Sequence, residues 1–304
     1  MSVELAIQTM TDVARSLELA QWAESAGLAA FAVADHYLTS ERDFRALDQI
    51  TVLAAVAART EAIELATLVS PITFRHPAVL LKAGVTIDEI SGGRFTLGLG
   101  AGWMEKEHEV FGFDFPATRE RLDRLEEALG YIASVREGSE SGFHGRHYHL
   151  APGPTPLPRG ERMRLAVGGS GPRRTPELAG TYADEFNVFP SRHPMDARIT
   201  AARRAAVDAV RDPDTILFST AFPLVVGEDR ADLDRRIDQV AAARGTEPDR
   251  IRTSWPRAGI PVATRDEYLE RLAELEALGI SRVYFQVGFD SPDDIRRSIG
   301  LLVS

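Results

Sequence analysis

The sequence predicts an α/β fold, a (β/α)8 barrel of the TIM type with insertions, on the strength of three observations. Short runs rich in β-branched and apolar residues alternate with helix-length amphipathic segments along the chain. Most of these runs are almost continuously apolar, as expected for parallel strands that are buried on both faces. Such a barrel takes about 250 residues, and insertions would extend it to the 304 residues of this chain. An open doubly wound sheet is the alternative fold.

The elements follow in order along the chain. In the first helix, Thr11 or Asp12 can cap the N-terminus, and Gly27 suits the left-handed residue that often ends a helix. The predicted strands are Val3–Gln8, Phe31–Ala34, Ile63–Val69, Phe95–Leu99, Arg164–Val167, Glu185–Phe189, Ile216–Val226 and Arg282–Val287. The predicted helices are Asp12–Ala26, Leu47–Arg59, Pro77–Ile90, Arg119–Arg136, Pro172–Tyr182, Pro194–Arg211, Asp229–Ala243, Arg265–Leu278 and Ser291–Val303.

Two stretches interrupt this repeat. Residues 138–163 and 244–264 are rich in proline, and the first also carries several glycines. Because no composition break marks a second domain, we expect one barrel domain over residues 1–304, with irregular insertions near 138–163 and 244–264. Long insertions of this kind usually serve as lids, binding loops or interfaces.

Composition excludes several classes of function. The chain has no cysteine, which excludes disulfides, thiolate catalysis and cysteine-based metal sites. A net charge of −10 disfavours binding to nucleic acid. No apolar run approaches the roughly 20 residues that span a bilayer, and the first residues lack the pattern of a secretion signal. We therefore expect a cytoplasmic protein with a small-molecule substrate and neither nucleic-acid nor membrane partners.

The candidate site residues follow the predicted strands, because barrel enzymes place their chemistry at the carboxyl ends of the strands. Asp35 and His36 come directly after the second strand, and a histidine there can donate a hydrogen bond or a proton at neutral pH. The structural alternative is a polar strand end that only holds a loop in place. The other polar, small or aromatic residues at strand ends are Gln8, Thr67, Leu68, Ser70, Gly100, Gly102, Trp103, Asn187, Gln286 and Gly288.

A glycine-rich loop follows the fifth predicted strand. Gly168, Gly169, Ser170 and Gly171 precede a short helix that begins near Pro172. Exposed backbone N–H groups at a helix N-terminus favour an anion, so we interpret this loop as a cofactor-phosphate site. A simple tight turn is the alternative. The GLGAGW run at 98–103 is not a dinucleotide fingerprint, because Trp103 occupies the place of its third glycine. Its glycines would instead let a flat ring approach the backbone.

Two further groups receive structural interpretations. His144, His147 and His149 have no suitably placed carboxylate beside them, so we expect a surface hairpin and no metal site. Glu105, Glu107 and Glu109 are typical of the solvated start of a helix, and only Glu107 is kept as a site candidate. Hydrolase, zincin and P-loop motifs do not occur in the sequence.

Three segments together resemble the luciferase-like monooxygenase superfamily, and within it the F420-dependent oxidoreductases. They are ADHY at 34–37, VSPITFRHPAVLLKAGVTIDEISGGRFTLGLGAGWMEKEHEVFG at 69–112, and VGGSG at 167–171 with TYADEFNV at 181–188. The resemblance covers nearly the whole chain. It implies a luciferase-like barrel, usually dimeric, that binds a planar cofactor at its mouth, with coenzyme F420 expected and FMN as the alternative.

The resemblance also implies roles for individual residues. Asp35 and His36 match the family's Asp-His pair beside the deazaflavin ring, with His36 as a proton donor or substrate-polarising group. Thr67–Leu68 matches the position of a non-proline cis peptide that contacts the ring. The candidate catalytic residues are Asp35, His36, Trp103 and Glu107. The candidate cofactor-binding residues are Asp35, His36, Thr67, Leu68, Ser70, Gly100, Gly102, Gly168, Gly169, Ser170, Gly171 and Asn187.

The chain departs from the family pattern at one position. Trp103 stands where the sugar-phosphate dehydrogenases of this group carry a catalytic glutamate, which argues against glucose-6-phosphate oxidation. A bulky aromatic residue suggests instead a wall for an apolar or aromatic substrate. We expect hydride transfer between C5 of the deazaflavin and an alcohol, activated alkene or imine. The alternatives are a two-component FMN monooxygenase and a barrel that binds ligand without catalysis. A homodimer and a flavin or F420 reductase partner are further expectations.

Overall fold

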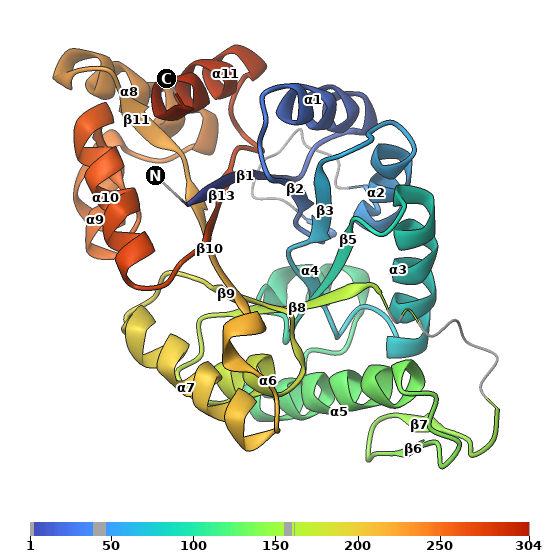
Figure 1. Ribbon diagram of the computed structural model, residues 1–304. Coiled ribbons are helices and arrows are strands. Elements are labelled where there is room, and N and C mark those ends of the chain that lie inside the picture. Colours follow the sequence, from blue (N-terminus) through green and yellow to red (C-terminus); the bar gives the residue numbers. More distant parts are fainter. Residues whose placement is uncertain (1–2, 39–46, 155–159, 161, 304) are drawn as a thin grey trace.

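The computed structural model describes residues 3–38, 47–154, 160 and 162–303 of the chain. At its centre, parallel strands form a closed ring in the order β1-β2-β3-β5-β8-β9-β10-β13, and β13 returns to pair with β1 (Figure 1). These strands are β1 (Glu4–Thr9), β2 (Ala30–Val33), β3 (Glu64–Thr67), β5 (Phe95–Gly100), β8 (Arg164–Gly169), β9 (Glu185–Val188), β10 (Leu217–Pro223) and β13 (Arg282–Gln286). The predicted closed barrel is confirmed, and the open sheet is excluded.

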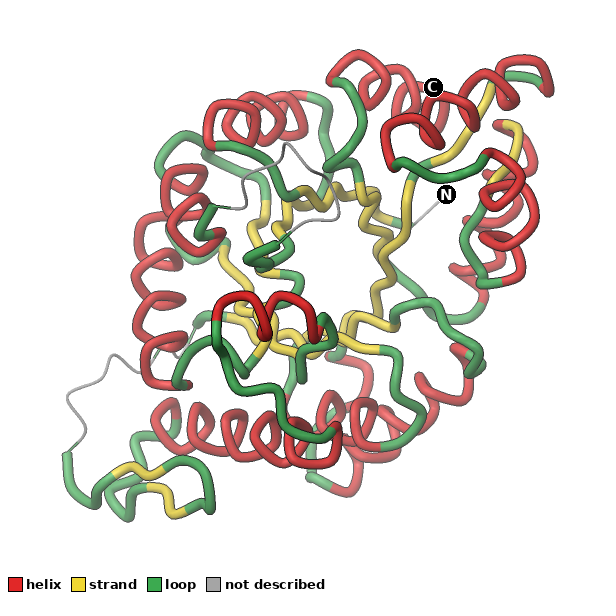
Figure 2. Tube along the Cα trace, turned by 180° about the vertical axis from the view of Figure 1, so that it is seen from behind, coloured by secondary structure: helices red, strands yellow, loops and turns green. Residues whose placement is uncertain are grey.

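Helices surround the ring on its outer side (Figures 1 and 2). They are α1 (Val13–Ser25), α2 (Gln49–Ala57), α3 (Pro77–Ser91), α4 (Glu105–Phe111), α5 (Thr118–Arg136), α6 (Arg174–Tyr182), α7 (Met195–Asp208), α8 (Arg230–Arg244), α9 (Pro248–Arg257), α10 (Arg265–Ala277) and α11 (Pro292–Val303). The short helix α4 differs from the others, since it lies behind the ring in Figure 1 and in front of it in Figure 2. It therefore covers one end of the barrel.

The local signals explain where the first helices begin and end. The Asp12 carboxylate accepts from the Arg15 N–H at the start of α1, as its sequence position predicts. Pro77 occupies the first turn of α3, and Gly92 ends that helix with φ +72°.

The structure corrects the sequence analysis at two places. The predicted strand Ile216–Val226 divides after Pro223, which has no N–H to continue the sheet. The chain then forms β11 (Val225–Gly227), which pairs with β12 (Val262–Thr264) outside the ring. The 244–264 segment was expected to be irregular, and this was wrong, because it contains both α9 and β12. Pro248 stands in the first turn of α9, where proline starts a helix rather than breaking it.

The other insertion is nearer to its prediction. Within residues 138–154 the chain forms a small antiparallel hairpin of β6 (Phe143–His144) and β7 (His149–Leu150), and residues 155–159 and 161 lie outside the described part. His144 and His149 face each other across the hairpin with their ring centroids 4.5 Å apart. In the described residues, no group of three or more His, Asp or Glu side chains is placed to hold a metal ion.

The inside of the ring is built mainly from small side chains. Ala6, Ala32, Ala66 and Ala221 pack around Tyr284 in a separate inner cluster. The larger apolar cluster lies between the strands and the surrounding helices. Small inner residues leave room above them for polar groups at the carboxyl ends of the strands, which is where a barrel carries its site.

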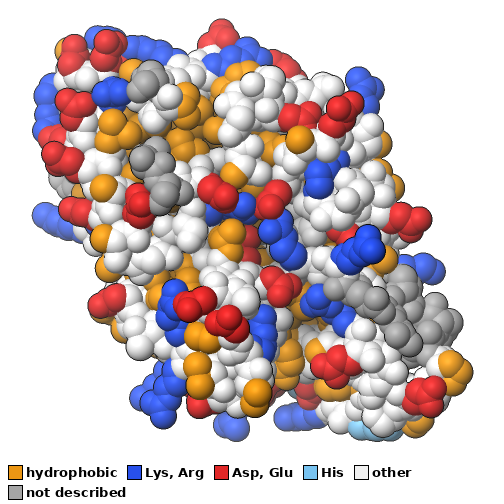
Figure 3. Space-filling view, in the orientation of Figure 1, with side chains coloured by type: hydrophobic (Ala, Val, Ile, Leu, Met, Phe, Trp, Pro, Cys, Tyr) orange, Lys and Arg blue, Asp and Glu red, His pale blue; other side chains and the backbone are white. Residues whose placement is uncertain are grey.

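The amino ends of the strands carry an ionic cluster around the buried Arg282. The Arg282 guanidinium contacts Glu4 at 2.6 Å and Glu64 at 2.7 Å, and Arg164 contacts the same Glu64 oxygen at 2.6 Å. This end of a barrel contributes to the stability of the fold, whereas the active site lies at the other end. On the face of the molecule shown in Figure 3, acidic and basic side chains are interspersed with apolar ones. No described helix is both long and apolar enough to cross a membrane.

Candidate functional site

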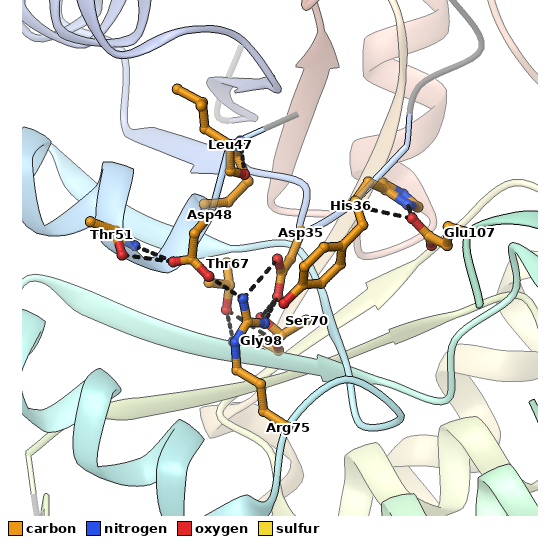
Figure 4. Close-up of polar contacts among 12 residues, drawn as sticks. Asp35, His36, Leu47, Asp48, Thr51, Thr67, Ser70, Arg75, Gly98 and Glu107 are labelled. Atoms are coloured by element: carbon orange, nitrogen blue, oxygen red, sulfur yellow. Dashed lines mark hydrogen bonds and ion pairs between the residues drawn. The ribbon is translucent and has the colours of Figure 1, made fainter. Parts of the chain in front are cut away.

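The loop after β2 sends its two polar side chains into separate clusters. Asp35 is almost completely buried and points toward Arg75, whereas His36 points toward Glu107 (Figure 4). The two residues are neighbours in sequence, and β2 ends only two residues earlier, at Val33. This loop therefore joins two polar clusters at the carboxyl end of the barrel.

Asp35 is the acceptor of the first cluster. The Ser70 hydroxyl donates to Asp35 Oδ2 at 2.9 Å, and Arg75 forms an ion pair with the same carboxylate. Arg75 also pairs with Asp48, the N-cap residue of α2. Burial raises the pKa of the Asp35 carboxyl, against the opposite effects of Arg75 and Ser70. The carboxylate thus ties the β2 loop, the β4 segment (Ser70–Pro71) and α2 together, and its ligands leave it little freedom to contact a substrate.

Arg75 is a site residue that the sequence analysis missed. It is the only basic residue between Arg59 and Lys82, and it directly precedes the His76–Pro77 start of α3. A lone arginine close to a predicted strand end is a signal that could have made Arg75 a site candidate, although not one that names its partner.

His36 and Glu107 form the second cluster. Nδ1 of His36 lies 3.0 Å from Oε1 of Glu107, and the backbone N–H of Tyr37 donates to Oε2 at 2.9 Å. The Leu38 N–H adds a longer contact of 3.4 Å to the same oxygen. Only 1% of Glu107 is exposed, while Glu105 and Glu109 on the same helix are exposed. Glu107 is thus not part of a solvated helix face but holds the His36 loop.

The charge of Glu107 decides which nitrogen of His36 can take part in chemistry. Burial raises the pKa of the Glu107 carboxyl, but the hydrogen bond and charge of His36 and the two backbone N–H groups outweigh it, so the pKa lies below its ordinary value. An ionised carboxylate only accepts hydrogen bonds, so Nδ1 of His36 must carry a proton. Nε2 is then the nitrogen left to give or take a proton.

Helix α4, which carries Glu107, is fixed by His108. His108 is fully buried, with Nδ1 2.8 Å from the Met104 carbonyl and Nε2 2.7 Å from the Thr73 hydroxyl. Its ring also packs against Phe74, at a centroid distance of 5.0 Å. The sequence analysis did not predict this histidine. Its contacts hold α4 against the loop that follows β4 and so position Glu107.

Trp103 lies at the entrance to α4. Gly102, with φ +80°, turns the chain after β5, and the indole that follows is 70% exposed. Its ring meets the His36 imidazole at a centroid distance of 5.8 Å and an interplanar angle of 82°. Trp103 and His36, both predicted from sequence, are therefore in direct contact.

The glycines of β5 and β8 make room for the end of strand β3. A Cβ atom on Gly100 would lie 2.6 Å from Cγ2 of Val69, and one on Gly168 would lie 2.8 Å from Cγ1 of the same side chain. A Cβ on Gly98 would lie 2.0 Å from the Thr67 carbonyl oxygen. These glycines are thus required by packing inside the ring, whereas their contact with a flat ring stays a prediction.

The structure places the cis peptide one bond later than the sequence analysis did. It joins Leu68 to Val69 rather than Thr67 to Leu68. The Leu68 N–H still donates to the Val33 carbonyl at 2.8 Å, so the ladder with β2 continues through Leu68. The Thr67 side chain instead bonds to β5, donating to the Gly98 carbonyl at 3.1 Å and accepting from its N–H at 2.8 Å.

Other predicted strand-end residues bond inside the barrel. Gln8 donates to the Leu68 carbonyl, and Gln286 donates to the Gln8 side chain at 2.8 Å. Asn187 is buried and donates to the Ser219 hydroxyl at 2.9 Å. Asn187 therefore has a partner within the ring, and its contact with a cofactor stays a prediction.

The chain is similar to known proteins in sequence and in fold. The family model described as luciferase-like monooxygenase matches residues 2–283 of the chain. The chain belongs to this family. It is 27% identical over 295 residues, 88% of this chain and 86% of the other, to the F420-dependent glucose-6-phosphate dehydrogenase of Microbacterium testaceum. It is 28% identical over 278 residues, 86% of this chain and 70% of the other, to the 4-hydroxyprotoasukamycin monooxygenase of Streptomyces nodosus subsp. asukaensis.

A solved structure supports the fold over the full length of this luciferase-like chain. It is an F420-dependent secondary alcohol dehydrogenase in complex with an F420–acetone adduct, with a TM-score of 0.78 and 18% identity. The superposition covers 100% of both chains. At that identity the likeness concerns the fold alone.

The glycine loop 168–171 of this luciferase-like chain leads from β8 to the N-terminus of α6. Among the described residues, no side chain caps the N-terminus of α6. Backbone N–H groups in the first turn of an uncapped helix favour an anion. A Cβ on Gly169 would lie 3.1 Å from the Thr175 side chain, and one on Gly171 would lie 2.9 Å from the Thr175 hydroxyl. The loop thus wraps closely around the first turn of α6, and the Ser170 side chain is exposed beside it. This arrangement fits a cofactor phosphate.

Proposed function

We propose that this chain is an F420-dependent oxidoreductase that transfers hydride between the deazaflavin and a small organic substrate such as an alcohol, an activated alkene or an imine. The observation that carries the proposal is the His36–Glu107 pair, with Nδ1 at 3.0 Å from the carboxylate, at the same barrel end as the uncapped α6 N-terminus. The relative from Microbacterium testaceum, named as F420-dependent, supports the choice of cofactor.

Different residues would bind the cofactor and transfer the proton. The loop 168–171 and the α6 N-terminus would hold the cofactor phosphate, and the carboxyl ends of β2 and β3 would face its ring system. The bound deazaflavin supplies a two-electron hydride acceptor or donor at C5. Glu107 keeps the proton of His36 on Nδ1, so that Nε2 accepts the proton of an alcohol or, once protonated, returns one to the product.

A binding titration tests the cofactor. We expect the purified protein to bind F420 tightly and FMN weakly, followed by fluorescence of each oxidised cofactor. The reverse result would favour the FMN-dependent monooxygenase, whose reduced flavin a partner reductase would have to supply. That alternative has support from the relative named as 4-hydroxyprotoasukamycin monooxygenase. Binding of neither cofactor would contradict both proposals.

Substitution of His36 tests its role. We expect His36→Ala to lower turnover by roughly 100-fold or more, because positioned acid–base groups contribute about that much. F420 affinity should fall much less than turnover, since the phosphate loop is unaltered. Full turnover in the variant would contradict the role of His36 even if the cofactor assignment is correct.

A further inference from the structure

Trp103 is an exposed aromatic side chain in a fixed place. Its indole is 70% exposed, although the segments on both sides are held by contacts. Before it, a Cβ on Gly102 would lie 3.0 Å from the Thr73 hydroxyl, so the backbone runs close to that loop. After it, the Met104 carbonyl accepts from Nδ1 of the buried His108. The exposure of Trp103 therefore belongs to the shape of the site and not to a loose chain end.

The indole stands directly beside the proton-transferring group. Its centroid lies 5.8 Å from that of His36, with the two rings nearly perpendicular. Glu107 occupies the Nδ1 side of the same imidazole. The indole therefore borders the imidazole on which a ligand at Nε2 of His36 would act.

Arg75 and Glu107, two described charged residues beside the loop after β2, are both engaged in contacts. Arg75 pairs with Asp35 and Asp48, and Glu107 binds His36 together with two backbone N–H groups. Further along α4, Val110 and Phe111 are 53% and 48% exposed. Aromatic side chains beside a few placed polar groups are typical of the lining of a ligand-binding site.

We propose that Trp103 is a specificity-determining residue, the apolar wall of a substrate subsite for uncharged molecules that carry an aromatic or cyclic apolar group next to an oxygen. The oxygen would contact Nε2 of His36, and the ring would pack on the indole. This proposal rests on the proposed function, because it places the subsite beside the proposed catalytic histidine. It names a class of substrate that the function alone leaves open.

Fluorine NMR tests the contact without requiring turnover. The chain has three tryptophans, Trp22, Trp103 and Trp255, so protein labelled with 5-fluorotryptophan gives three signals that single Trp→Phe variants assign. We expect 1-phenylethanol to shift the Trp103 signal saturably in the F420-loaded protein and to leave the other two unchanged. Glucose 6-phosphate should leave all three signals in place. A Trp103 signal that does not respond to 1-phenylethanol would overturn the proposal.

Affinity provides the second readout. We expect Trp103→Ala to weaken binding of 1-phenylethanol by roughly tenfold, because the ring loses most of its apolar contact. F420 affinity and the melting temperature should stay the same, since the side chain is largely exposed. Val207→Ala, at a similarly exposed position on α7, is the matched control and should change nothing. If Trp103→Ala and the parent protein bind 1-phenylethanol with equal affinity, the proposal that Trp103 forms the wall of the subsite is contradicted.

The two proposals fail in different ways. If F420 does not bind, the proposed function fails, and the same titrations are repeated on the FMN-loaded and cofactor-free protein. A saturable shift of Trp103 there would still support the apolar wall, and its absence in all three forms would overturn it.

Discussion

At the scale of single residues, the site depends on carboxylates that hold other groups rather than react themselves. Glu107 accepts from the Nδ1 side of His36 and from the Tyr37 backbone, and Asp35 is enclosed by Arg75 and Ser70. Each carboxylate connects a strand-end loop to a segment far away in sequence. Asp35 and His36 both follow β2, but only His36 keeps a side-chain atom, Nε2, that is available for chemistry.

Replacing Glu107 should lower the stability of the folded protein. Glu107→Gln puts an amide where the Tyr37 N–H and the His36 Nδ1–H both need an acceptor, and we expect a loss of about 1–3 kcal/mol in the free energy of unfolding at pH 7. Chemical denaturation measures it. Glu105→Gln, at an exposed position on the same helix, is the control and should stay within about 0.5 kcal/mol of the parent.

The difference between the two proteins should depend on pH. Because the folded-state pKa of Glu107 lies below its ordinary value of 4.5, its stabilisation is present above that value and is lost as pH falls through the folded-state pKa. We therefore expect the gap between parent and Glu107→Gln to narrow on acidification below about pH 4.5. A gap that widens on acidification would contradict the lowered pKa of Glu107 in the folded state.

At the scale of elements, the end of α7 carries a conformation that its residue does not favour. Among the described residues, Val210 is the non-glycine with positive φ, at +57°, and it is 96% exposed. It occupies the position after a helix where glycine is usual, and a left-handed conformation costs an L-residue about 1–2 kcal/mol. We expect Val210→Gly to raise the free energy of unfolding by about 0.5–1 kcal/mol, measured by denaturation. Val207→Gly, inside the same helix, should lower it.

The contact between α6 and α7 makes a prediction of the opposite sign. A Cβ on Gly180 would lie 2.1 Å from the Ala202 carbonyl oxygen, so the two helices touch through backbone there. We expect Gly180→Ala to destabilise the protein by about 1–3 kcal/mol, although alanine favours helices. Gly300→Ala in α11 is the matched control, since nothing lies within 4 Å of its Cβ, and it should stabilise. Equal effects of the two substitutions would contradict close packing at Gly180.

At the scale of the whole molecule, the sequence predicted the barrel well because its signals are local. Every ring strand was found from its apolar run, and the resemblance assigned Asp35 and His36 to the site. What sequence could not show was pairing across the chain. The bonds that join His36 to Glu107 and Asp35 to Arg75 span 71 and 40 residues, and a pattern of single residues does not encode them. Because the contact with His36 could not be foreseen, the sequence analysis interpreted the glutamates of α4 as the solvated start of a helix.

The expected homodimer is a prediction at this same scale. A groove of about 520 Å³ lies between α2 and α3 on the outer wall, lined mainly by apolar residues, namely Ile50, Thr51, Ala54, Ala78, Val79, Lys82, Ala83, Thr86 and Ile87. This groove belongs to the outer helices and not to the His36 site. Val79 is 55% exposed within it, and burial against a second copy would remove that apolar surface from water.

Sedimentation equilibrium measures the association. We expect a dimer of the parent chain at micromolar concentration and a monomer for Val79→Glu, because a carboxylate would have to lose its water in a mainly apolar interface. Val207→Glu is the control, since its side chain is 59% exposed on α7, away from the groove, and it should leave the dimer intact. A dimer that survives Val79→Glu would move the interface to another face. His36 and Glu107 contact each other within one chain, so we expect the Val79→Glu monomer to keep its affinity for F420.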